Sequence, residues 1–228
     1  MFYFHGTRTP DFVSIRHIDY DDYWRERGFS INKKLKEREE IMLQEIPKGS
    51  KVLDLGSGNS LLPVALKNKG CEVTVGDVSK EVLKGYIPYN IKAIHIDLEK
   101  TTELFLKDSF DYIILSEVLE HTKNPEDILC ALIPFTKYFF LTIPNSAFYR
   151  YRIHLFFAGR FFTQWVYHPS EHLRYWSHID FIDWLKALGF KIIRAESSNG
   201  FSLLGLPLYN WFPNLFGHQI CYLVKKIK

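Results

Sequence analysis

Acidic residues and a glycine-rich turn follow one another at regular intervals in the first half of the chain. Asp54 is followed by Gly56 and Gly58 in the stretch VLDLGSGNS, and Asp77 and Asp97 come further along. Each acid ends a short apolar run that is typical of a buried strand. A glycine-rich turn lets the backbone approach a ligand closely, and carboxylates accept hydrogen bonds from hydroxyl and amino groups. The pattern therefore predicts a binding site for a ligand that carries such donors.

Two common ligands of glycine-rich turns do not fit this stretch. The dinucleotide fingerprint G-x-G-x-x-G needs a third glycine where this chain has Leu61, and Asp54 would repel a pyrophosphate. A Walker phosphate-binding loop is excluded because no Gly-Lys-Ser/Thr follows the glycines. A ligand that is cationic near Asp54 and carries no phosphate there fits better.

S-adenosylmethionine has groups that match the three acids. Its ammonium group suits Asp54, its ribose diol suits Asp77, and its adenine amino group suits Asp97. We expect the glycine turn to lie against the methionine portion. The residues predicted to bind this cofactor are Asp54, Gly56, Ser57, Gly58, Asp77, Val78, Asp97, Leu98 and Ser116.

The elements that position these residues alternate between strand and helix. Apolar runs predict strands at 51–55, 71–77, 93–97, 110–117, 138–145, 191–197 and 218–226, with helices at 60–69, 79–86, 126–135 and 178–190 between them. Continuous apolar runs are typical of strands that helices cover on both faces. The order predicts an α/β fold, a Rossmann-like doubly wound sheet of seven mostly parallel strands. Ligands of such sheets bind at the carboxyl ends of the strands, where the acids fall.

The motifs around these residues resemble those of class I S-adenosylmethionine-dependent methyltransferases. VLDLGSGNS, VTVGDVS, IHIDLEK and FDYIILSEVLEH follow in the order of that family and cover roughly residues 50–145. The carboxyl half, from LTIPNSAFYRYRIHLFFAGR to NLFGHQICYLVKK, resembles a narrower MetW-like, methyltransferase type 11-like branch. The resemblance implies a methyltransferase that uses S-adenosylmethionine as its cofactor.

The MetW-like branch also implies a second interpretation. Its namesake is thought to assist homoserine acyltransfer, so the chain could be an accessory protein that binds and activates an acyltransferase without methyl transfer. Two features favour an enzyme: about 45 residues precede the glycine turn, and EVLEH (117–121) stands where typical members lack the acid and the histidine. We expect methyl transfer to a small-molecule acceptor, at a hydroxyl oxygen.

The stretch EVLEH carries the residues predicted to act on the acceptor. It follows the fourth predicted strand, and we predict catalytic roles for His121 and Glu117. A histidine with a pKa of about 6.5 can take a hydroxyl proton near neutrality. The same E-x-x-E-H pattern resembles one in ubiquinone-biosynthesis and small-RNA 2′-O-methyltransferases that can hold a divalent cation. That resemblance makes Glu117, Glu120 and His121, with His168 or His172, candidate ligands and leaves the metal question open.

The flanking segments define the predicted organisation of the chain. Residues 1–46 are expected to form an N-terminal arm and a helix that cap the site, and 47–228 the methyltransferase domain. The charged stretch KKLKEREE is predicted to be the solvated face of that helix, which spans 31–46. Residues 146–178, rich in aromatic rings, Arg and His, are predicted to be an insertion over the carboxyl edge of the sheet.

The insertion has three readings from its sequence. As a lid it would bring Arg150, Arg152 and Arg160 to the acceptor and favour an anionic one. As a basic amphipathic surface, residues 150–166 would contact a membrane peripherally or enter a partner's groove. For most of its Phe residues, plain core packing is an equally good explanation.

Composition limits the partners and the compartment. The net charge of +3 argues against nucleic acid as a partner, and the three widely spaced cysteines predict no disulfide framework. The apolar stretches are shorter than the roughly 18 residues of a membrane span. We therefore expect a cytoplasmic protein, and a homodimer stays open.

Overall fold

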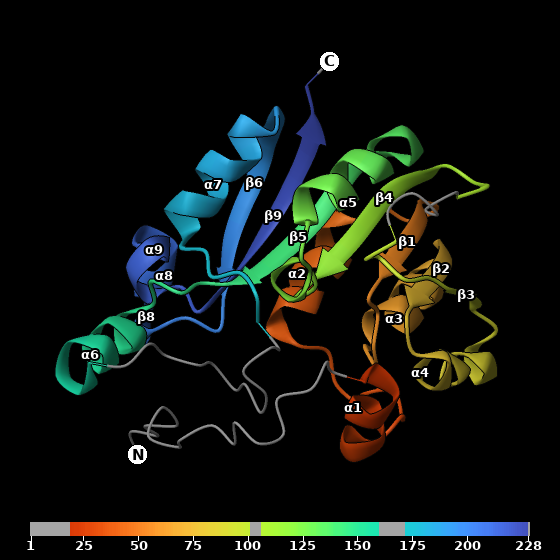
Figure 1. Ribbon diagram of the computed structural model, residues 1–228, viewed down its shortest axis with the longest axis horizontal. Helices are drawn as coiled ribbons and strands as arrows, with labels where there is room; N and C mark the ends of the chain where they lie inside the picture. Colours follow the sequence, from red (N-terminus) through yellow and green to blue (C-terminus); the bar gives the residue numbers. More distant parts are fainter. Residues whose placement is uncertain (1–18, 101–105, 160–171, 228) are drawn as a thin grey trace.

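A single mixed sheet forms the centre of the molecule in the computed structural model, which describes residues 19–100, 106–159 and 172–227. Its seven strands lie in the order β3-β2-β1-β4-β5-β9-β6 (Figure 1). They are β1 (Lys51–Leu55), β2 (Glu72–Asp77), β3 (Lys92–His95), β4 (Phe110–Ser116), β5 (Thr136–Pro144), β6 (Phe190–Ser198) and β9 (Gln219–Lys226). Neighbours among β1 to β5 pair in parallel, while β9 runs antiparallel to both β5 and β6. The predicted seven-stranded, mostly parallel sheet is confirmed.

The direction in which strands are added to the sheet reverses at its centre. From β1 the chain adds β2 and then β3 on one side, whereas β4 and β5 lie on the other side. At such a switch point the loops after neighbouring strands diverge and leave a crevice at the carboxyl ends of the strands. The crevice lies between the ends of β1 and β4, next to the turn that follows Leu55.

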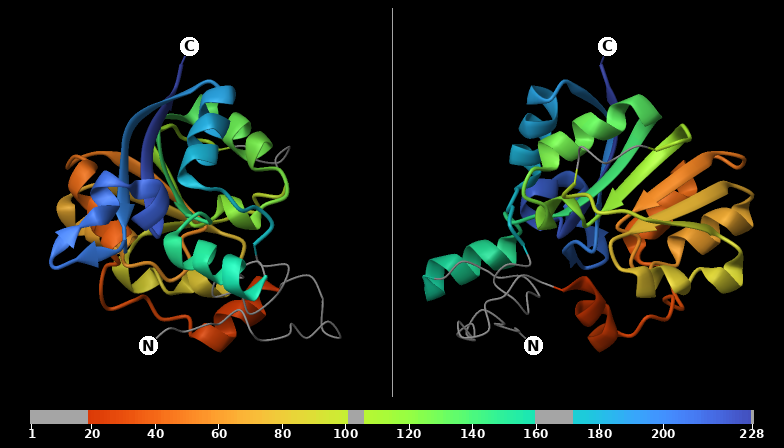
Figure 2. Two further views of the ribbon diagram at one scale, coloured as in Figure 1. Left: turned by 90° about the vertical axis from the view of Figure 1, so that its left-hand side faces the viewer. Right: turned by 45° about the vertical axis from the view of Figure 1, so that its right-hand side comes forward.

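Helices cover both faces of the sheet and bury two separate apolar clusters. Side chains alternate between the faces along each strand, so Leu53 and Ile113 belong to one cluster and Val52 and Ile114 to the other. The first cluster is covered by α5 (Pro125–Leu132) and α7 (His178–Ala187), and the second by α2 (Glu37–Glu45) and α3 (Leu62–Lys69). Figure 2 shows these helices on opposite sides of the strands.

The amino-terminal part of the described chain differs from the prediction. The helix expected at 31–46 begins only at Glu37, because the segment before it is non-helical and the Asn32 amide donates to the carbonyl oxygen of Asn59 at 2.9 Å. A helix that was not predicted, α1 (Tyr20–Arg27), precedes it and is capped by the side chain of Asp19.

Further short elements were not predicted either. The carboxyl part contains α6 (Tyr149–Ala158), a hairpin of β7 (Ser202–Leu203) and β8 (Leu206–Pro207), α8 (Leu208–Trp211) and α9 (Pro213–Phe216). The remaining elements are α4 (Lys80–Lys84) and the 3₁₀ turns η3 (Ile87–Tyr89), η5 (Leu119–His121) and η6 (Ile133–Phe135). Of these, α4 lies within the helix expected at 79–86, and the Ser79 hydroxyl caps it by accepting the Val82 amide. None of the helices within the described ranges combines the length and the apolar character that a membrane crossing needs.

Asn145 ties the end of β5 to the elements that precede β9. Its side chain is fully buried, and its amide nitrogen lies within 3.2 Å of three carbonyl oxygens, those of Pro213, Asn214 and Gly217. Its carbonyl oxygen accepts the amide of His178, the first residue of α7, at 3.3 Å. One side chain thus holds together three segments that are distant in the sequence.

Asn145→Ala should lower the free energy of unfolding by about 2–4 kcal/mol, because each buried polar group left without a partner costs about 1–3 kcal/mol. Urea denaturation followed by circular dichroism measures the change. Asn124→Ala is the matched control, since Asn124 is exposed and makes no capping bond, and it should change stability by less than about 0.5 kcal/mol. Equal losses in the two variants would contradict the role of Asn145.

Candidate functional site

A cavity of about 1090 Å³ opens at the switch point of the sheet. Its walls come from α1, from the start of α2, from the loops after β1, β2, β3 and β4, and from the short segments around 172–173 and 218–219. All the residues predicted from the sequence to bind the cofactor or to act on the acceptor line it: Asp54, Gly56, Ser57, Gly58, Asp77, Val78, Asp97, Leu98, Ser116, Glu117 and His121. The fold thus brings together residues that are spread over 68 positions of the chain, from Asp54 to His121.

The glycine turn after β1 is closed so tightly that side chains do not fit. Gly56 and Gly58 have φ angles of +66° and +50°, values that favour glycine. A Cβ atom at Gly58 would lie 2.5 Å from the ring of Trp24, and one at Gly56 would lie 2.5 Å from Val118. Glycine is therefore required at both positions, which form part of the cavity wall.

Asp77 at the end of β2 holds the turn in place. Its carboxylate accepts the amides of Gly58 and Ser79, both at 2.9 Å. Burial raises the pKa of Asp77, while these backbone hydrogen bonds lower it. The Ser79 hydroxyl also donates to Asp21 on α1, which brings a second carboxylate towards this wall.

Asp54 lies on the buried inner wall of the cavity. Burial raises its pKa well above the ordinary value, and the negative charges of Glu39 and Asp77 raise it further. Glu39 is itself buried and accepts hydrogen bonds from the Ser60 hydroxyl and the Lys36 amide, both at 2.9 Å. Three carboxyl groups therefore make this wall favourable for a ligand with a positive charge.

The expectation that KKLKEREE is a solvated helix face is wrong for Glu39 and misses the part that Lys36 and Arg38 have in the site. Lys36 and Arg38 line the cavity, and Glu39 is buried. Burial lowers the pKa of Lys36, and the charge of Arg38 lowers it further. The cause is the late start of α2, whose first turn points at the glycine loop. The glutamate three residues after the N-cap position was the available signal for this helix start.

A polar network forms the floor of the cavity beyond β4. Glu117 has a φ angle of +57°, uncommon for a residue other than glycine. Its carboxylate accepts a hydrogen bond from Gln219 at 2.8 Å and one from the Thr142 hydroxyl at 3.3 Å. Arg38 donates to both Gln219 and Ser116, at 3.1 and 3.3 Å. These partners fix the position of Glu117, whose predicted catalytic role stays a prediction.

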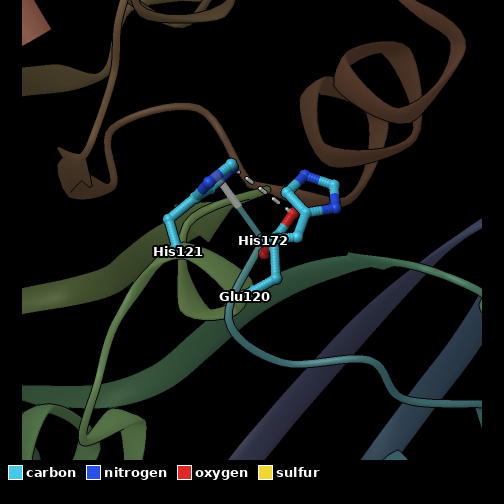
Figure 3. A group of neighbouring side chains, drawn as sticks. All are labelled: Glu120, His121 and His172. Carbon is cyan, nitrogen blue, oxygen red and sulfur yellow. Dashed lines mark ion pairs between the residues drawn. The ribbon is translucent and has the colours of Figure 1, made fainter. Parts of the chain in front are cut away.

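Glu120, His121 and His172 gather at the same end of the cavity (Figure 3). The two imidazole rings are 4.7 Å apart between centroids, and His121 Nε2 lies 4.0 Å from Glu120 Oε1. Burial raises the pKa of Glu120 well above its ordinary value, with a further contribution from Glu117. Burial and the neighbouring His121 lower the pKa of His172 to about 3. His168, the other histidine proposed from the sequence, lies outside the described residues.

Two segments were predicted to cover the site, the amino-terminal residues 1–46 and the insertion 146–178, and described residues from both line the cavity. On α1, the side chains of Tyr20, Tyr23 and Trp24 line the cavity. From the segment 146–178, the described residues that reach the cavity are His172 and Leu173.

Arg150 and Arg152 of α6 are not among the residues that line the cavity in the described chain. Arg152 instead donates to the carbonyl oxygen of Asn214 at 3.2 Å. Arg160 and most of the expected lid lie outside the described residues, so the lid and the membrane contact remain predictions.

The sheet order and the position of the cavity define the fold class of class I S-adenosylmethionine-dependent methyltransferases. Residues 36–224 match the family described as "Methionine biosynthesis protein MetW". The chain therefore belongs to the MetW family.

Curated relatives match part of the chain only. The bifunctional methionine biosynthesis protein MetXA/MetW of Rhodopirellula baltica is 30% identical over 136 residues, which are 54% of this chain and 21% of that protein. The ubiquinone biosynthesis O-methyltransferase of Idiomarina loihiensis is 36% identical over 107 residues, 43% of this chain and 44% of the relative. The chain thus spans less than half the length of either relative.

Solved structures share the fold at low sequence identity. Magnesium protoporphyrin IX methyltransferase from Synechocystis, solved with bound S-adenosylhomocysteine, has a TM-score of 0.59 and 15% identity, covering 91% of this chain and 98% of that one. A TehB-like S-adenosylmethionine-dependent methyltransferase from Corynebacterium glutamicum has a TM-score of 0.58 and 15% identity, covering 91% and 96%. These likenesses establish the fold.

The raised pKa of Asp54 predicts a pH-dependent stability. A carboxyl group with a raised pKa in the folded state stabilises the fold below the unfolded pKa of about 3.9 and loses that contribution as the pH rises through the folded pKa. Asp54→Asn should therefore be more stable than the ligand-free wild type at neutral pH, with a difference that shrinks towards pH ~4. Urea unfolding across this range measures the difference. Glu81→Gln serves as the control, because the Glu81 side chain is 43% exposed and lies outside the cavity. A difference independent of pH would refute the assignment.

Proposed function

We propose that this chain is an S-adenosylmethionine-dependent methyltransferase that methylates a hydroxyl oxygen of a small-molecule acceptor. The observation that carries the proposal is the cavity at the switch point, where a closed glycine turn meets the carboxylates of Asp54 and Asp77. No phosphate-binding feature accompanies them in the glycine loop, whose inner wall is acidic.

The residues present fit the cofactor's groups. The wall of Asp54 and Glu39 suits an ammonium group, and Asp77 suits a ribose diol. Asp97 and Leu98 line the cavity beyond β3, where an adenine would find an acceptor and an apolar contact. The turn depends on glycine, because a side chain at Gly58 would clash with the ring of Trp24, which also lines the cavity.

Bound S-adenosylmethionine would supply a methyl group on a positively charged sulfur. Transfer to a hydroxyl forms an oxygen–carbon bond, breaks the sulfur–carbon bond with its electron pair left on sulfur, and releases one proton. The chain's own contribution is to align the acceptor, exclude water and promote the loss of that proton. His121 stands at the end of the cavity where the acceptor would enter, and Glu117 is anchored beside it. An amine acceptor is less well served, because Ser-Glu-Val-Leu occupies the loop after β4 instead of an Asn/Asp-Pro-Pro-Tyr/Phe motif.

A second function follows from the family and from one relative. The Rhodopirellula protein is described as bifunctional, MetXA and MetW together. By that analogy, this chain would bind an acyltransferase of the methionine pathway and activate it without methyl transfer. Co-purification with such an acyltransferase, in the absence of any turnover of labelled cofactor with cell-extract fractions, would favour this function over the enzyme.

Asp77→Ala should weaken binding of S-adenosylmethionine and of S-adenosylhomocysteine by at least about tenfold, because a charged hydrogen bond is worth about 1.5–3 kcal/mol. Isothermal titration calorimetry on the purified chain measures both affinities. Asp108→Ala is the matched control, since Asp108 lies outside the cavity and pairs with Lys92. Unchanged affinity in Asp77→Ala would overturn the cofactor site, and binding of NAD in its place would overturn the function.

His121→Ala should lower methyl transfer by about 10²–10⁴-fold, the usual contribution of a group that assists proton loss. Cofactor affinity should stay nearly constant, because His121 lies at the acceptor end. Release of S-adenosylhomocysteine with an active extract fraction measures turnover, and calorimetry measures affinity. Near-normal turnover in the variant would show that the residue is structural only.

A further inference from the structure

The cluster of Glu120, His121 and His172 combines donor atoms that bind transition metals. One carboxylate oxygen and one ring nitrogen from each histidine lie within 4.8 Å of one another. Ligand atoms around a single ion lie about 3–4 Å apart, since each is about 2.0–2.2 Å from the metal. Small side-chain rotations would therefore bring the three atoms around one ion.

The burial of Glu120 is an independent observation. Its side chain is 1% exposed, and neither carboxylate oxygen has a hydrogen-bond partner in the described chain. Within those residues, the one ion-pair distance to Glu120 is the 4.0 Å to His121, and no lysine or arginine pairs with it. Buried carboxylates are normally paired, hydrogen-bonded or coordinated to a metal. Figure 3 shows this carboxylate beside the two imidazole rings.

The backbone holds His172 opposite the other two side chains. The amides of Leu173 and Arg174 both donate to the carbonyl oxygen of Glu120, at 2.7 and 3.1 Å. The Arg174 guanidinium donates to the carbonyl oxygen of Lys123 at 2.6 Å. These bonds attach residues 173–174, next to His172, to the turn η5 and to Lys123 just after it. The three donor side chains are therefore held in fixed relative positions.

We infer that Glu120, His121 and His172 bind one divalent transition-metal cation, such as Zn²⁺, Mn²⁺ or Fe²⁺, at the acceptor end of the cavity. Two imidazoles and one carboxylate suit these ions and leave positions open for an outside ligand. Mg²⁺ prefers oxygen ligands and should bind weakly. Since all three residues line the cavity, the open positions face the space for the acceptor.

The inference rests on the proposed function and gives His121 a definite role within it. A hydroxyl that coordinates a divalent cation is more acidic than a free one. The cation would lower the pKa of the acceptor hydroxyl, its proton would pass to water, and the oxygen would be ready to form the new bond to carbon. His121 then acts as a ligand of the cation and does not itself take the proton.

Metal binding by the full chain tests the inference. Protein freed of metal with a chelator is titrated with Zn²⁺ and Mg²⁺ by calorimetry and with Co²⁺ by visible absorption. We expect one Zn²⁺ or Co²⁺ per chain, bound more tightly than Mg²⁺. Glu120→Gln and His172→Ala should each weaken Zn²⁺ binding at least about a hundredfold, since even groups that only orient a ligand contribute about 10–100-fold. Glu81→Gln, which changes a carboxylate outside the cavity, should bind like the wild type.

The results separate the metal site from the cofactor site. Zn²⁺ affinity that is unchanged in both Glu120→Gln and His172→Ala, with thermal unfolding showing that the variants are folded, would overturn the inference. So would the absence of bound Zn²⁺ and Co²⁺ in the wild type at tens of micromolar metal. Calorimetry with S-adenosylmethionine on the metal-free chain tests the proposed function separately. If the chain binds S-adenosylmethionine but neither Zn²⁺ nor Co²⁺, the inference alone is refuted. A metal site without cofactor binding refutes the proposed function alone.

Discussion

The hydrogen bond from the Gly58 amide to the Asp77 carboxylate determines how the cavity is built. It joins the turn after β1 to the end of β2 at 2.9 Å, and the bond is buried. A carboxylate that accepts two backbone amides is rigid, so the loop that follows has one position. The ring of Trp24 can then pack directly on Gly58, and α1 closes over the cavity only because that glycine has no side chain.

Charge is divided between the two ends of the cavity. Carboxylates gather on the wall next to the glycine turn, where burial raises the pKa values of Asp54 and Asp77. At the other end Arg38 is linked to Glu117 through Gln219, and two histidines meet Glu120. Lys36 interacts with the charges of both Glu39 and Glu117. A ligand with a positive group at one end and polar oxygens at the other would match this division. Without a ligand, several carboxyl groups stay buried with raised pKa values, which destabilises the fold at neutral pH. Such raised pKa values are common at functional sites.

The sequence predicted what local patterns determine and missed what tertiary contacts determine. The strands were predicted because their apolar runs are continuous, and the acids at their ends because a parallel sheet collects them at one edge. The helix at 31–46 was placed too early, since Ile31 and Leu35 fit a helical period yet pack on the core from a non-helical segment. Lys36 and Arg38 were assigned to solvent because their charge, taken alone, indicates a surface. His172 was one of the two histidines that the sequence offered as a further ligand, but the backbone bonds from Leu173 and Arg174 to Glu120 that bring it to the cluster have no signature in the sequence.

The antiparallel strand β9 has a consequence for the order of events during synthesis. Within the described chain, β6 joins the sheet through β9 alone, and β9 carries Gln219, which fixes Glu117 in the cavity floor. Until residues 219–226 have left the ribosome, the edge of β5 is open and β6 has no partner. The chain emerges from its amino terminus, so the wall that carries Asp54 and Asp77 is translated well before Gln219. The floor around Glu117 is completed by Gln219, which is translated 102 positions later, and until then β5 has an unpaired edge, a feature that favours misfolding.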